Sequence, residues 1–136
     1  LRALTKPGYA VTKEVHMGAL ANAVQRVLDE RWGGIAGRDA AVHFGLGAGR
    51  NPQQLLKNWL QRGIPAVRAV LILRGLPDDR RRDVARAELR ERLGGISEAY
   101  LTVIRVWTAD DSTVRLVAAA LGCDVEAARD WLALAA

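Results

Sequence analysis

Glycine and proline residues divide this chain of 136 residues at short intervals, and this division most constrains its fold. The segments between them carry apolar residues three and four positions apart, which is typical of one face of an α-helix. Glycines suit the ends of such helices, and proline suits their first turn. We therefore expect an all-α fold, a compact array of about eight short helices containing one or two helix-turn-helix-like units. The expected helices cover residues 12–32, 37–46, 52–62, 65–74, 76–95, 97–107, 112–122 and 125–136.

Composition agrees with a helical domain of ordinary size. Hydrophobic residues make up 50% of the chain and aromatic residues only 5%, a balance rich in helix-favouring alanine, leucine and arginine. No segment predicts a strand. The helices at 12–32, 65–74 and 97–107 should supply much of the core, and the first ten residues should form a loose arm.

Cysteine usage and hydropathy favour a cytoplasmic protein. The single cysteine, Cys123, cannot form a disulfide within the chain. The most apolar stretch, 64–73, is interrupted by Arg68 and is too short for a membrane span, which needs about 20 residues. We therefore expect no membrane partner.

Charge divides the chain into two regions. Residues 38–74 contain six Lys or Arg residues and one acid, whereas residues 95–136 contain three Arg residues and six acids. We interpret residues 1–94 as a basic helical region and residues 95–136 as an acidic helical region, packed together as one domain. A basic segment of this kind suggests a polyanionic partner; the alternative is uneven surface charge without a partner.

Residues 37–62 have the residue pattern of a helix-turn-helix, the candidate DNA-binding unit of the basic region. Ala41 takes the position where a small residue lets two helices approach, and Gly45 takes the position of the turn. Ala40, Phe44 and Leu46 fill the next apolar positions. Leu56 and Trp59 should be core residues of the second helix.

The stretch "LKNWLQRGIP", residues 56–65, extends this pattern. Together with the preceding residues it resembles the helix-turn-helix domain of lambda-type phage repressors, over about residues 37–75. The resemblance implies sequence-specific binding of double-stranded DNA by the 51–62 helix, usually by a homodimer. The turn departs from the family pattern, because "GAGRN" makes it about five residues longer.

Amide and basic side chains on this segment are suited to DNA. Glutamine and asparagine can pair with adenine in the major groove, and arginine prefers guanine. Basic side chains and the free N–H groups at a helix start can bind phosphates. The alternative for each residue is an ordinary solvated position. The candidate DNA-binding residues are Arg38, Arg50, Asn51, Gln53, Gln54, Lys57, Asn58 and Arg62.

A second helix-turn-helix-like pair spans residues 114–131, with a turn of the tight length. Its second helix displays Asp124, Glu126 and Asp130 against Arg129 alone, and carboxylates repel phosphates. We interpret this pair as structural or as a surface for self-association or a protein partner.

Catalytic and metal chemistry find little support in the sequence. The only histidines, His16 and His43, have no metal-ligand spacing with Cys123. The "GLGAG" stretch lacks the Gly-Lys-Ser/Thr ending of a phosphate loop. Salt bridges should join the acids and arginines of "DDRRRD" on a solvated helix face. We expect no enzymatic activity, no metal and no cofactor.

The favoured function is that of a transcriptional regulator of bacterial or phage type, which inserts helix 52–62 into the major groove. The alternative is a helical protein-interaction or assembly adaptor that does not bind DNA. An RNA-binding module ranks lower, because aromatic residues are not interleaved with the basic ones.

Overall fold

The computed structural model describes residues 18–94 and 111–136, and every regular element within these ranges is an α-helix. The all-α prediction is therefore confirmed for the described residues. Seven helices are present there, against about eight expected for the whole chain; the expected helix 97–107, the N-terminal arm and residues 12–17 lie outside the described ranges. The helices are α2 (Gly18–Trp32), α3 (Arg38–His43), α4 (Pro52–Arg62), α5 (Ala66–Arg74), α6 (Asp78–Arg92), α8 (Asp111–Leu121) and α9 (Val125–Ala135).

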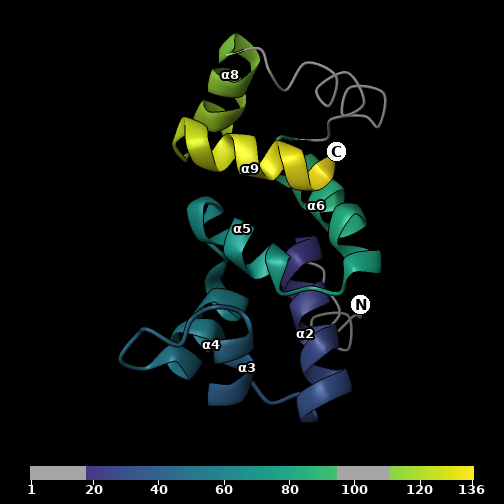
Figure 1. Ribbon diagram of the computed structural model, residues 1–136, viewed down its shortest axis with the longest axis vertical. Coiled ribbons are helices and arrows are strands. Elements are labelled where there is room, and N and C mark those ends of the chain that lie inside the picture. Colours follow the sequence, from purple (N-terminus) through teal and green to yellow (C-terminus); the bar gives the residue numbers. More distant parts are fainter. Residues whose placement is uncertain (1–17, 95–110) are drawn as a thin grey trace, which may run out of the picture.

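The described helices pack into a compact body with two distinct ends (Figure 1). Helices α3 and α4 lie at the lower end in this view, and α8 and α9 lie at the upper end. Helix α6 packs against both α2 and α9, and α5 packs against α6 and α9. No described helix is both long and apolar enough to cross a membrane.

The ends of α4 follow from local sequence, as predicted. Asn51 is the N-cap, and its Oδ1 accepts a hydrogen bond from the backbone N–H of Gln54 at 3.4 Å. Pro52 occupies the first turn, where its missing N–H costs no hydrogen bond. Gly63 ends the helix with φ of +118°, a conformation that side chains disfavour.

The start of helix α2, in contrast, is stabilised by side chains that are distant in the sequence. Gly18 has φ of +85°, and the first turn of α2 contains no acid. The Glu88 side chain on α6 instead accepts a hydrogen bond from the N–H of Leu20 at 2.8 Å, and Glu91 accepts one from Ala19 at 3.0 Å. Both carboxylates also complement the partial positive charge at the start of α2.

Three arginines of α6 are seen to bind the carbonyl groups of other segments. Arg81 donates to the carbonyls of Leu73 and Leu76 at 3.2 and 2.9 Å, on either side of Arg74, where α5 ends. Arg86 donates to the carbonyl of Ala135 at 2.7 Å, at the end of α9. A salt bridge of the predicted kind joins Arg81 to Asp78 at 2.8 Å. In addition, arginines of α6 bind carbonyl groups at the ends of α5 and α9, which the sequence did not predict.

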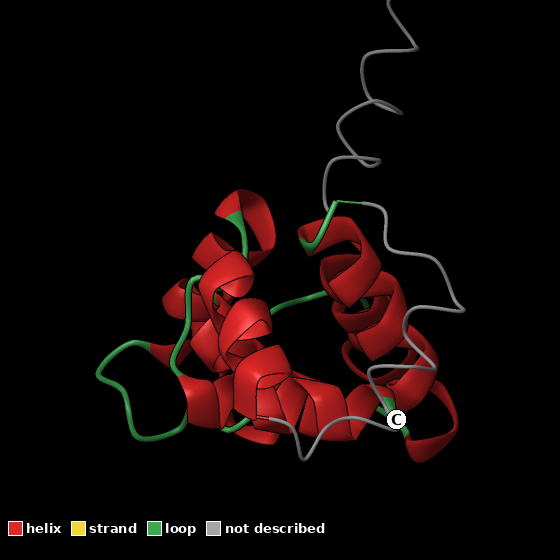
Figure 2. Ribbon diagram, turned by 90° about the horizontal axis from the view of Figure 1, so that it is seen from above, coloured by secondary structure: helices red, strands yellow, loops and turns green. Residues whose placement is uncertain are grey.

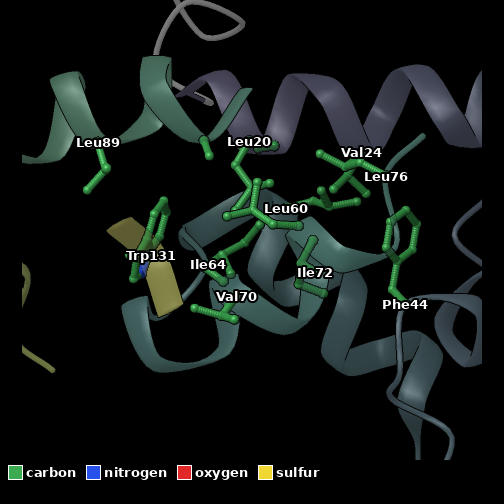
Figure 3. Close-up of a cluster of buried hydrophobic side chains, with 14 of the residues drawn as sticks. Leu20, Val24, Phe44, Leu60, Ile64, Val70, Ile72, Leu76, Leu89 and Trp131 are labelled. Atoms are coloured by element: carbon green, nitrogen blue, oxygen red, sulfur yellow. The ribbon is translucent and has the colours of Figure 1, made fainter. Parts of the chain in front are cut away.

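The core contains buried residues from every described helix, and Figure 3 shows a part of it to which α2, α5, α6 and α9 contribute. Trp131 is fully buried, and its indole N–H donates to the carbonyl of Ala66 at 2.9 Å. Leu20, Ile72 and Leu89 bring one fully buried side chain each from α2, α5 and α6. The expectation that the first helix and the 65–74 helix supply the core is confirmed for α2 and α5.

Removing the Glu88 carboxylate should destabilise the whole fold. We expect Glu88→Ala to lower the free energy of unfolding by about 3 kcal/mol, because it leaves Arg92 partly buried without its ion-pair partner and the N–H of Leu20 without an acceptor. Urea unfolding followed by circular dichroism measures the change. Asp83→Ala is the matched control, since Asp83 is an exposed acid on the same helix without a partner among the described residues, and its effect should stay within about 0.5 kcal/mol. Equal losses in the two variants would contradict this role of Glu88.

Candidate nucleic-acid interface

Helices α3 and α4 pack against each other through the apolar residues that the sequence pattern singled out. Ala41 and Leu56 have no exposed surface, and Phe44 is 1% exposed. Ala40 and Leu46 are also buried, and Trp59 packs partly buried against the same core. The spacing of these residues therefore predicted correctly which face of each helix points inward.

The connection between the two helices, residues 44–51, begins with a turn that requires glycine. Gly45 has φ of +84°. A Cβ atom at this position would lie 2.9 Å from the Cδ1 and Cγ atoms of Leu71 on α5. The rest of the connection extends outward from the side of the molecule (Figure 1, Figure 2).

The outer face of α4 is polar and accessible. Gln54, Lys57 and Arg62 are exposed, and Asn58 is half-buried. The side-chain amide of Gln54 donates to Oδ1 of Asn58, one turn further on, at 3.1 Å. This hydrogen bond limits the rotamers of both amides, so the pair presents its remaining donors and acceptors in a defined arrangement.

Gln53 and Gln61 differ from the sequence-based expectation. Gln53 is half-buried, and its Oε1 is enclosed without a hydrogen-bond partner among the described residues. Helical spacing explains this, because Gln53 lies three positions before the buried Leu56. Gln61 was not among the candidates, yet it is exposed and follows Gln54 by seven positions, on the same stripe of the helix.

Most of the basic side chains at this end of the molecule have no partner among the described residues. Within the described ranges, five successive cations form no hydrogen bond or ion pair: Arg38, Arg50, Lys57, Arg62 and Arg68. All five are exposed, and residues 40–77 contain no acid. Arg68 on α5 was not among the candidates, although its place in the basic segment could have indicated it. Most arginines of α2 and α6, in contrast, pair with acids or bind carbonyl groups, for example Arg80 with Glu30 at 3.1 Å.

The acidic helices lie at the other end of the body (Figure 1). Helix α9 packs mainly against α5, α6 and α8. Asp124 caps α9 by accepting from the N–H of Ala127 at 2.8 Å, and Arg129 pairs with Asp111. Gly122, with φ of +72°, makes the tight turn between α8 and α9. These acids therefore leave the polar face of α4 open.

His43 and Cys123, the described side chains most suited to catalysis or metal binding, lie in environments that indicate a structural role. His43 donates from Nε2 to the carbonyl of Gly75 at 2.8 Å, and Arg31 approaches its Nδ1 at 3.3 Å. Burial, and then the charge of Asp124, raises the pKa of the Cys123 thiol, while Arg92 lowers it; the net increase makes the reactive thiolate scarcer at neutral pH. In residues 18–94 and 111–136, no group of three or more His, Cys, Asp or Glu side chains could hold a metal ion.

Comparison of the chain with models of protein families, with curated proteins and with solved structures gives no match. The described geometry therefore carries the functional argument.

Substitution of the turn glycine should test how α4 is held. We expect Gly45→Ala to lower the free energy of unfolding by about 2–4 kcal/mol, because it adds the strain of positive φ to a collision with Leu71. Gly122→Ala is the control, since it has a similar φ but no atom within 4 Å of the added Cβ; it should cost only about 1–2 kcal/mol. Thermal or urea unfolding measures both values, and equal costs would mean that the contact with Leu71 is unimportant.

Proposed function

We propose that this protein binds double-stranded DNA by inserting α4 into the major groove, as the second helix of a helix-turn-helix formed by α3 and α4. The major groove is wide enough to admit an α-helix. In this proposal, α3 lies across the DNA backbone while the start of α4, with its free N–H groups, approaches a phosphate.

One observation carries the proposal: five of the seven cations that have no partner among the described residues lie at the end of the molecule that bears α4. A folded protein usually pairs or disperses its charges, since an accumulation of like charges is unfavourable. Here Lys57 and Arg62 belong to α4 itself, and Arg38, Arg50 and Arg68 belong to the segments on either side. Such a set supports binding to a polyanion, which would release counterions and make the affinity strongly dependent on salt.

The outer stripe of α4 supports recognition of bases as well as phosphates. Gln54, Asn58 and Gln61 are amides at helical spacing, flanked by the cations. With one N–H of Gln54 bound to Asn58, its Oε1 and its second N–H remain for an adenine edge. The half-buried Gln53 contributes less to recognition in this proposal than Gln54.

A single α4 covers only a few base pairs. We therefore propose a homodimer that reads two half-sites about one helical turn apart, and a cytoplasmic role as a transcriptional regulator of bacterial or phage type.

Loss of two α4 cations should weaken DNA binding and reduce its dependence on salt. For Lys57→Ala combined with Arg62→Ala, we expect affinity to fall on the order of tenfold and the slope of log affinity against log salt to fall by about 2, because two phosphate contacts are lost. Fluorescence anisotropy with a labelled duplex at several salt concentrations measures both quantities.

The matched control for this experiment combines Arg82→Ala with Arg115→Ala. It removes the same net charge from exposed residues that likewise have no described partner but lie on α6 and α8. This control should retain most of the affinity and the slope. DNA binding that is equal in the two double variants would place the interface elsewhere.

Replacement of the Gln54 amide should change specificity rather than general affinity. We expect Gln54→Ala to lose the preference for one base pair, a change of about 1–3 kcal/mol in discrimination, with little effect on the salt slope. Selection from random duplexes at two salt concentrations, followed by sequencing, measures this preference. Gln53→Ala serves as the comparison and should change the selected sequence less. An identical selected motif for wild type and Gln54→Ala would exclude base recognition by this side chain.

The second candidate function is that of a helical adaptor, and a specific observation favours it. Leu116 is 72% exposed on α8 and Val125 is 38% exposed at the start of α9, next to the acids Asp124 and Glu126. Exposed apolar side chains and neighbouring acids suit a basic, partly apolar protein partner. Absence of DNA binding by the wild-type protein at low salt would favour this function over DNA recognition.

A further inference from the structure

An open groove lies beside α4, between the turn after α3 and helix α5. Its volume is ≈ 460 Å³, within the range of small-molecule sites. It lies on the flank of α4 that carries Leu55 and Trp59, away from the stripe of Gln54 and Gln61. The described lining residues are Gly45, Leu46, Ala48, Gly49, Leu55, Trp59, Arg68 and Leu71.

The walls of the groove are mostly apolar. Trp59 and Leu71 are half-buried and therefore keep part of their surface open to solvent, and Leu55 is 38% exposed. The larger cleft, near His43, differs in this respect, because Glu30, Arg31 and Asp78 are among its lining residues and place both signs of charge there. The groove beside α4 thus combines an indole ring and leucine side chains that favour a flat apolar body.

A single charge borders this apolar surface. Arg68 is the only charged residue among the described lining residues, and it is exposed without a hydrogen bond or ion pair in the described part of the chain. A guanidinium group pairs well with a carboxylate, often through two parallel hydrogen bonds. No described carboxylate lines the groove to compete for Arg68.

We propose that this groove binds a small amphipathic anion, with its flat apolar body against Trp59, Leu55 and Leu71 and its carboxylate on Arg68. The volume of the groove suits a molecule of metabolite size. The site lies apart from the base-reading stripe of α4. It shares Arg68 with the proposed DNA-binding surface, but binding of the anion requires no DNA, so each proposal can fail or succeed in its own test.

The test uses indole-3-acetate as the probe and indole-3-acetamide as its neutral counterpart. Titration of the ¹⁵N-labelled protein, followed by amide chemical shifts, gives both the location and the affinity. We expect saturable shifts confined to the residues around the groove, with a Kd for the acetate of about 1 mM or tighter. Arg68→Gln should weaken binding of the acetate by about three- to fivefold and leave binding of the acetamide unchanged.

Two further variants distinguish specific binding in the groove from general electrostatic attraction of the probe to the protein. Arg50→Gln removes the same charge from an exposed residue outside the groove lining, and it should leave the affinity for the acetate unchanged. Ala48→Phe adds bulk at the exposed edge of the groove and should weaken both probes; its spectrum without probe shows whether the fold is retained. Shifts scattered over the molecule, no shifts at about 10 mM probe, or equal weakening by Arg50→Gln and Arg68→Gln would overturn the proposal.

Discussion

The ion pair between Glu88 and Arg92 on α6 is the contact through which several segments of the body are joined. Glu88 is only 7% exposed, and both of its carboxylate oxygens have partners: Leu20 donates to Oε1 and Arg92 donates to Oε2 at 2.8 and 2.6 Å. Arg92 also donates to the carbonyl of Ile64 at 2.6 Å and lies 5.5 Å from the centre of the Trp131 ring. A buried charge is tolerated only when it is paired and hydrogen-bonded in this way.

This arrangement explains why the arginines of the chain have two different roles. Most arginines of α6 bind carbonyl groups or acids, and several hold helices together, as Arg86 does for the end of α9. The cations from Arg38 to Arg68 have no such task within the described residues, and they stand at the end of the molecule that bears α3 and α4. The contrast, rather than the net charge of +5, supports a polyanion as the partner of this end. Arg68, one of these cations, also borders the apolar groove beside α4.

Much of the candidate site could be predicted from the chain alone, because helical spacing determines which side chains of α4 share a face. The burial of Leu56 and the exposure of Gln54 and Lys57 follow from that spacing together with the apolar pattern. Two parts could not be predicted. Gln53 is half-buried because it borders the packed face of α4. The groove with Arg68 forms only because α5 folds back beside the turn at Gly45.

The sequence by itself determined the helical class, the ends of α4 and the inward faces of α3 and α4. Caps, prolines, glycines and apolar periodicity act within a few residues of the chain, so they can be recognised without a structure. Only the tertiary structure decided where α2 begins, which arginines make internal contacts and which have no partner in the described part of the chain. Those outcomes depend on groups far apart in sequence, such as Leu20 and Glu88, and no local pattern specifies which distant carboxylate or carbonyl a long side chain will reach.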